Sequence, residues 1–286
     1  MAMSSLVQRI VTAAILVPVV LAALFALPPL GWGLVSLVII AAAAHEWAKL
    51  VGLRSLHAML FIAAVVVIGL LLLFVPALGF DRGWPSRVVL VACGMAGAFW
   101  LVVAPAWLNA QWRTQRPLAM AIIGAIVLVG AWVAIVDLQA HSPWLVLASM
   151  AVVWLADTAA YFSGRRFGRR KLAPSISPNK SWEGVWGGLL AVALYAFALT
   201  ALGARAGYAN EWKLSLALAF VAFVVVLAAI SIVGDLYESM LKRQANVKDS
   251  GTLLPGHGGV LDRIDALLPA MPLAAIAVTL FLNDGA

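Results

Sequence analysis

The residues best suited to chemistry lie near the end of the chain, between two long apolar segments. Residues 235 to 265 contain two acidic pairs, Asp235 with Glu238 and Asp262 with Asp265. Within each pair the residues are three positions apart, so on a helix both carboxylates would share one face. Two such faces brought together could hold a divalent cation through carboxylate oxygens.

Basic residues and glycines separate these acidic pairs. Lys242, Arg243 and Lys248 carry charges suited to phosphate, and residues 255–259 read Pro-Gly-His-Gly-Gly. Glycines let backbone N–H groups approach an anion, and a helix that begins after Gly259 would offer its positive N-terminus to the same group. Acid, base and glycine together indicate metal-assisted phosphoryl or nucleotidyl transfer.

The same stretch resembles the signature of the phosphatidate cytidylyltransferases, also called CDP-diglyceride synthetases. The match has no gap and falls on Ser239, Lys242, Arg243, Lys248, Asp249, Gly251, Leu254, Pro255, His257, Gly258, Gly259, Asp262, Arg263 and Asp265. A second block, Asp157 to Gly168 followed by Ser-Pro-Asn-Lys-Ser-Trp-Glu-Gly at 177–184, is also similar to the family. The resemblance covers residues 150 to 266 well, and the first 140 only through hydropathy and span count.

The resemblance implies that CTP and phosphatidic acid react to give CDP-diacylglycerol and pyrophosphate. Two anionic reactants must then meet, so cations have to cancel their repulsion. We expect Mg²⁺ at Asp235 and Asp262; the family favours a second metal ion, whose site Asp265 or Asp249 could complete. The expected catalytic residues are Asp235, Asp262, Lys242, Arg243, Lys248, Asp249, His257, Arg263 and Asp265. The expected substrate-binding residues are Asp157, Ser177, Asn179, Lys180, Ser239, Gly258 and Gly259. The family alone suggests a homodimer.

Several of these roles have alternatives that the sequence leaves open. His257 is expected to donate a hydrogen bond to phosphate or anchor the loop, and a proton carrier is the second reading. Asp262 and Arg263 could instead only form ion pairs within the cluster. Asp157 could be a polar tie between helices, through Thr158 and Tyr161, in place of a functional carboxylate.

Composition places the chain in a membrane. Of its 286 residues, 64% are hydrophobic and 11% charged, and the mean hydropathy is +1.03, all far from soluble averages. The net charge of +7 could suggest nucleic acid, but the basic residues lie between apolar spans and form no single patch. The single cysteine, Cys93, is expected to be buried and inert.

A spanning helix needs about 20 mostly apolar residues, which predicts an all-α polytopic fold of nine transmembrane helices. The candidates are residues 10–27, 30–48, 58–77, 87–108, 118–137, 143–163, 183–204, 213–234 and 266–282. The first could imitate a secretory signal, but its length and the later spans favour an uncleaved helix. We divide the chain into scaffold helices, 1–140, and helices with the catalytic loops, 141–286.

The distribution of Lys and Arg predicts the topology. All 19 except Arg82, Arg87, Arg205 and Lys213 fall on the side that holds the N-terminus. The positive-inside rule puts that side, with both reactive loops, in the cytoplasm. The lack of a long N-terminal extension or a retention signal favours a bacterial inner membrane over an organelle.

Other polar and small residues carry local expectations. Glu46 lies at the cytoplasmic end of the second span, where a charged carboxylate is energetically unfavourable unless it has a partner or contacts water. It could pair with Lys49 or cap a helix, or it could line the polar cavity. Ser181 is expected to cap the seventh span. Gly94, Gly97, Gly187 and Gly188 are expected to allow close helix packing.

Three rival functions fit less well. A transporter with Asp157, Asp235 and Asp262 along an ion path should show inverted repeats, and none is detectable. Other membrane transferases, prenyltransferases and CDP-alcohol phosphotransferases, also carry aspartate pairs, but the D-G-x-x-A-R pattern of the latter is missing. A CTP-dependent lipid kinase would release CDP in place of pyrophosphate. Phosphate-binding G-x-x-x-x-G-K-[ST] loops, zinc helices and serine elbows are absent from the sequence.

Overall fold

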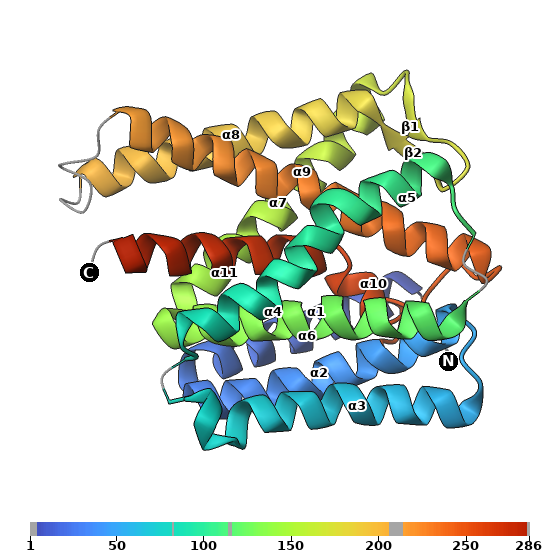
Figure 1. The fold of residues 1–286 in the computed structure, drawn as a ribbon. Helices are drawn as coiled ribbons and strands as arrows, with labels where there is room; N and C mark the ends of the chain where they lie inside the picture. The colour runs from blue at the N-terminus through green and yellow to red at the C-terminus, as the bar shows by residue number, and fades with distance from the viewer. Residues whose placement is uncertain (1–4, 82, 114–115, 206–213, 285–286) are drawn as a thin grey trace.

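The computed structural model describes residues 5–81, 83–113, 116–205 and 214–284, and these residues are almost entirely helical (Figure 1). The long helices are α1 (Ser5–Ala26), α2 (Pro29–Leu50), α3 (Ser55–Phe74), α4 (Ser86–Ala98), α6 (Pro117–His141), α7 (Pro143–Phe167), α8 (Trp182–Arg205), α9 (Leu214–Gln244) and α11 (Leu267–Asp284). The short ones are η1 (Pro76–Leu78), η2 (Phe99–Val103), α5 (Ala104–Ala110) and α10 (Leu261–Ile264).

The helices confirm the all-α membrane fold. Among the described residues, seven helices are long and apolar enough to cross a membrane, and two shorter apolar helices lie at Val11–Ala26 and Leu267–Phe281. Each of the nine predicted spans coincides with one of these helices. Prolines mark several starts, because Pro29, Pro117 and Pro143 occupy first-turn positions that need no N–H donor.

The fourth predicted span contains an irregularity, since a π-helical turn, η2, joins α4 to α5. Pro105 lies in the first turn of α5 and has no N–H to donate to the carbonyl four residues earlier. Because that carbonyl lacks its usual donor, the backbone forms a π-helical turn here in place of regular α-helix.

Helix α6 is the centre of the fold and packs against α2, α3, α4, α7 and α11. Its side chains Val127, Leu128, Trp132 and Val136 are fully buried, as expected for a helix that is apolar all round. Cys93 of α4 is also buried, as predicted.

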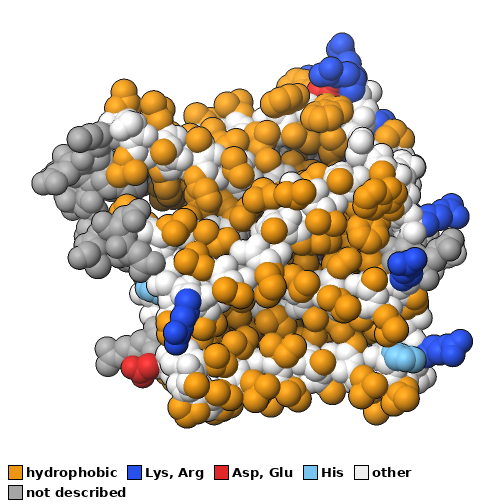
Figure 2. All heavy atoms as spheres, viewed as in Figure 1, with side chains coloured by type: hydrophobic (Ala, Val, Ile, Leu, Met, Phe, Trp, Pro, Cys, Tyr) orange, Lys and Arg blue, Asp and Glu red, His pale blue; other side chains and the backbone are white. Residues whose placement is uncertain are grey.

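The outer surface is apolar over most of the face shown in Figure 2. Lys and Arg gather at the end that carries the β hairpin and the N-terminus in Figure 1. A broad apolar band with charges at its edge suits a protein surrounded by lipid. Arg82 and Lys213, which the topology prediction used, lie outside the described residues.

A two-stranded antiparallel hairpin, β1 (Lys171–Ala173) and β2 (Ser177–Ser181), connects α7 to α8. The sequence predicts only a loop here, because strands this short show no alternating pattern. Glu183 holds the hairpin base by accepting the N–H groups of Arg169 and Arg170, at 3.0 and 3.2 Å. Ser181 accepts the N–H of Gly184 at 3.2 Å, which confirms it as the cap of α8.

The predicted close packing holds for three of the four glycines. A side chain on Gly187 would meet Ser163, one on Gly188 would meet the backbone of Ala156, and one on Gly97 would meet Leu273. Gly94 was predicted wrongly, because the space beside it is open.

Candidate active site

The site forms where the last turns of α9, the loop 245–260 and the short helix α10 meet. Asn246 has φ of 57°, a left-handed conformation that ends α9 and turns the chain back. The turn predicted at 255–259 is also present, with positive φ at Gly256 and Gly258 and a hydrogen bond from the N–H of His257 to the Leu254 carbonyl at 2.8 Å. These local features bring Asp262 back toward α9.

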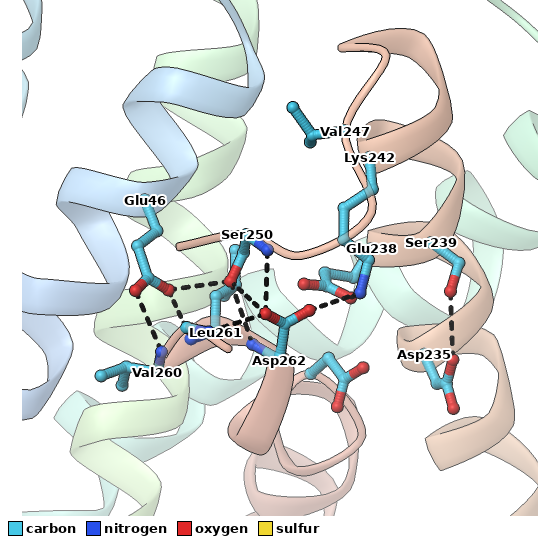
Figure 3. Close-up of polar contacts among 12 residues, drawn as sticks. Glu46, Asp235, Glu238, Ser239, Lys242, Val247, Ser250, Val260, Leu261 and Asp262 are labelled. Atoms are coloured by element: carbon cyan, nitrogen blue, oxygen red, sulfur yellow. Dashed lines mark hydrogen bonds and ion pairs between the residues drawn. The ribbon is translucent and has the colours of Figure 1, made fainter. Parts of the chain in front are cut away.

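Asp262 is the most heavily hydrogen-bonded carboxylate of the site (Figure 3). Its Oδ1 lies 2.5 Å from Nζ of Lys242, and its Oδ2 accepts the N–H of Ser250 at 2.8 Å and that of Gly259 at 2.9 Å. Burial alone would raise the pKa of Asp262, but the hydrogen bonds from Lys242, Gly259 and Ser250 outweigh it and lower the pKa below its usual value.

Lys242 lies between two carboxylates. Its ammonium forms ion pairs with Asp262 and with Glu238, one turn earlier on α9. Lys242 is only 9% exposed and Glu238 only 3%. Buried charges of this kind need partners, yet Oε1 of Glu238 is buried and has no hydrogen-bond partner among the residues that the structure describes. Glu238 was not among the predicted site residues, although its spacing from Asp235 pointed to it.

Asp235 joins the second sequence block to the first. Its Oδ2 lies 2.6 Å from Nζ of Lys180 on β2, and its Oδ1 accepts a hydrogen bond from Ser239 at 3.3 Å. Asp157 of α7 is exposed and lies within electrostatic range of both Lys180 and Asp235. Three segments far apart in sequence therefore contribute to one polar cluster, as the two similar blocks suggested.

Asp265 completes the acidic group. Burial, followed by the negative charge of nearby Asp235, raises the pKa of Asp265 to about 7. Glu238 interacts electrostatically with both Asp265 and Asp262. The two acidic pairs, Asp235 with Glu238 and Asp262 with Asp265, therefore lie within electrostatic range of each other.

A hollow of about 690 Å³ lies beside this cluster. Its lining includes Lys248, Asp249, His257, Gly258 and Arg263, all predicted site residues. Hollow and cluster are contiguous, because a side chain added to Gly258 would come 2.8 Å from Oδ2 of Asp262. Nδ1 of His257 is also buried, and no hydrogen-bond partner for it lies within the described ranges of the chain.

Not every predicted residue joins the cluster. Arg243 instead donates to the carbonyls of Ile176 and Val247, at 3.3 and 3.4 Å, and lines a separate hollow of about 380 Å³. Ser177 pairs with Ala173 in the hairpin, and Asn179 is exposed on the same strand as Lys180. The hydroxyl of Tyr161, which the alternative reading of Asp157 invoked as a partner, accepts a hydrogen bond from Arg165 at 3.4 Å.

Glu46 of α2 is the contribution that sequence reasoning did not resolve. It is 1% exposed and accepts the N–H groups of Val260 and Leu261, at 3.0 and 2.8 Å, and the hydroxyl of Ser250, at 2.9 Å (Figure 3). Pairing with Lys49 was the wrong expectation, since no ion pair joins the two in the described part of the chain and Lys49 is exposed. Glu46 therefore anchors the site loop through Ser250, Val260 and Leu261.

The carboxylates suit a hard cation such as Mg²⁺, which needs only one or two protein carboxylates and takes its other ligands from water and phosphate. The cluster has more carboxylates than ammonium groups, and Glu238 has a buried unpaired oxygen. Within the described ranges, however, no three acidic, His or Cys side chains converge on one point. A cation held here would therefore take few ligands from the protein and would need the others from water or substrate.

Comparisons with known proteins agree over nearly the whole chain. The sequence model of the cytidylyltransferase family matches residues 7–281. A protein of Pseudomonas aeruginosa named phosphatidate cytidylyltransferase is 40% identical, over 94% of this chain and 95% of its own length. Proteins of the same name from Haemophilus influenzae and Brucella suis are each 34% identical, covering 93% and 98% of this chain and 96% and 95% of their own lengths.

Proposed function

Because the chain belongs to the cytidylyltransferase family, we propose that it transfers the cytidylyl group of CTP to phosphatidic acid, releasing pyrophosphate. The observation that carries the proposal is the polar cluster, in which Lys180 of the 157–184 block pairs with Asp235 of the 235–265 stretch. The same stretch holds the ion pair between Lys242 and Asp262. The cluster adjoins a hollow lined by further basic groups. The product is CDP-diacylglycerol, which phospholipid synthesis consumes.

The residues of the chain would neutralise the charge of the two reactants and position them. An oxygen of the lipid phosphate attacks the α-phosphorus of CTP while the bond from that phosphorus to the bridging oxygen of pyrophosphate breaks. Both reactants are anionic, so Lys180 in the cluster, with Lys248 and Arg263 in the hollow beside it, offsets their repulsion. The attacking oxygen is already ionised, so the reaction needs little help from a general base.

Asp235 and Asp262 would hold Mg²⁺, with Asp265 or Glu238 able to support it. When bound there, the ion supplies a positive charge to the phosphate oxygens and to the departing pyrophosphate. Lys180 and Lys242 lie against these carboxylates at 2.6 and 2.5 Å and balance part of their negative charge. They are also placed to contact phosphate oxygens that arrive beside the carboxylates.

We place the protein in a bacterial inner membrane, with the site facing the cytoplasm where CTP is found. The apolar band supports a multi-pass protein, and the matched relatives come from bacteria. A homodimer is part of the proposal through the family resemblance. The acyl chains would stay in lipid while the phosphate reaches the cluster near Asp157, which is exposed.

The test is a label-transfer assay on the purified protein in detergent. It receives phosphatidic acid, Mg²⁺ and CTP labelled separately at the α and γ phosphates. The proposal expects α label in the lipid and release of pyrophosphate, with Asp262→Asn folded but inactive. Entry of the γ label would instead identify a CTP-dependent lipid kinase, and no transfer of either label would reject both.

A further inference from the structure

The Thr12 hydroxyl of α1 donates to the Pro255 carbonyl of the site loop at 3.0 Å. A buried contact from the first half of the chain to the site is made by Glu46 of α2. Its carboxylate contacts the hydroxyl of Ser250, a residue 204 positions away, and the N–H groups of Val260 and Leu261 at the start of α10. Both oxygens are used, since Oε1 accepts from Val260 and Oε2 from Leu261 and Ser250. A carboxylate buried to this degree is stable only because these donors replace water.

Ser250 lies between two carboxylates. Its Oγ is 2.9 Å from Oε2 of Glu46 and 2.9 Å from Oδ2 of Asp262. A hydroxyl has one hydrogen and can donate to only one of them at a time. The N–H of Ser250 holds Asp262 in either case, at 2.8 Å. The position of Asp262 therefore depends on the loop residue Ser250, which is in turn hydrogen-bonded to Glu46.

Two glycines of the site loop make room for this arrangement. A side chain on Gly251 would collide with Oε1 of Glu46, and one on Gly259 would collide with Oε2 of Glu46 and the hydroxyl of Ser250. Neither glycine has a positive φ, so the need for glycine here is steric and not conformational. The anionic groups closest to the backbone of this loop are therefore the carboxylates of Glu46 and Asp262.

We propose that Glu46 is a positioning residue for the reaction, orienting Asp262 through Ser250 and the first turn of α10. This inference rests on the proposed function. It gives the N-terminal helices a part in the chemistry, because α2 then sets the geometry of a carboxylate that would hold the metal ion. Glu46 itself touches neither substrate nor metal.

The test compares Glu46→Gln with wild type and with Lys49→Gln, an exposed position on the same helix. The glutamine keeps the shape but offers one acceptor oxygen where three donors converge. We expect the Mg²⁺ concentration for half-maximal activity to rise about 10–100-fold, the usual effect of losing a group that supports a metal ligand. Lys49→Gln should match wild type. If Glu46→Gln only reduced the number of folded molecules, the maximal rate would fall but the Mg²⁺ concentration for half-maximal activity would stay the same. A lower rate with an unchanged Mg²⁺ requirement would therefore overturn the proposal.

Amide hydrogen exchange gives a second readout that needs no activity. In Glu46→Gln, faster exchange confined to residues 248–263 supports the proposal, and unchanged or uniformly faster exchange contradicts it. If wild type transfers no label, the proposed function fails, yet the exchange pattern still decides whether Glu46 holds this loop.

Ser250→Ala serves if Glu46→Gln does not fold. It keeps the bonds from Glu46 to Val260 and Leu261 and removes only the shared hydroxyl. A smaller rise in the Mg²⁺ requirement supports the proposal, and no rise contradicts it. In the double variant the two losses should be less than additive, because both act on Asp262.

Discussion

Nζ of Lys180 and Oδ2 of Asp235 lie 2.6 Å apart, although 55 positions separate the two residues in the chain. The pair joins the hairpin to α9 and is about one quarter exposed on both sides. Replacing Lys180 by Met should lower activity about 100-fold or more, as loss of one preorganised charged group does. Lys171→Met, at an exposed position of the partner strand, is the control and should retain activity. Equal losses in both variants would contradict a specific role for Lys180.

Lys242→Met should damage stability far more than Lys180→Met. Lys242 is buried between Glu238 and Asp262, and its removal leaves two buried carboxylates facing each other. We expect a cost of about 3–5 kcal/mol, against about 0–1 kcal/mol for the more exposed Lys180 pair. Thermal unfolding of both variants in the same detergent measures the difference. Similar midpoints would show that Lys242 is not essential to the cluster.

Removal of divalent metal should abolish transfer. EDTA is expected to stop the reaction and added Mg²⁺ to restore it, because the acidic cluster carries more carboxylates than its lysines can balance. Asp235→Asn should need more Mg²⁺ than wild type for the same rate. Full activity in EDTA would remove the metal from the mechanism.

Acidification should remove the contribution of Asp262 to stability. Hydrogen bonds hold the pKa of Asp262 in the folded protein below its usual value, so its ionised form stabilises the fold. That contribution is fully present above the unfolded pKa of about 3.9 and is lost as the pH falls through the lower folded pKa. The difference in unfolding midpoint between wild type and Asp262→Asn should therefore shrink as the pH falls below about 4. A difference that stays constant would contradict this linkage.

Two glycine substitutions should have opposite outcomes. Gly251→Ala forces a methyl group against Glu46 and should destabilise the protein by about 1–3 kcal/mol. Gly94→Ala meets open space on a helix and should be neutral or stabilising. Unfolding midpoints in one detergent compare them, and the same sign for both would argue against the packing around Glu46.

The predicted orientation can be tested with single cysteines, since the native Cys93 is buried. In intact spheroplasts an impermeant maleimide should label Asp81→Cys, and it should label Lys49→Cys only after permeabilisation. Both positions are exposed. The reverse labelling pattern would place the site outside the cytoplasm.

The sequence by itself determined the membrane fold, the types of reactive residue and the local turns. Runs of apolar residues predict helices because every backbone polar group in lipid must be satisfied within its own segment. The turn at 255–259 was predictable for a similar local reason, since its glycines allow positive φ.

Only the tertiary structure decided which charged group meets which. Lys242, predicted as a phosphate ligand, lies between two carboxylates, and Glu46, left between several roles, backs the loop of Asp262. Such partners follow from how whole helices pack, which depends on the shapes of many side chains together. Spacing along one helix reports which residues share a face, but not what another helix brings to that face.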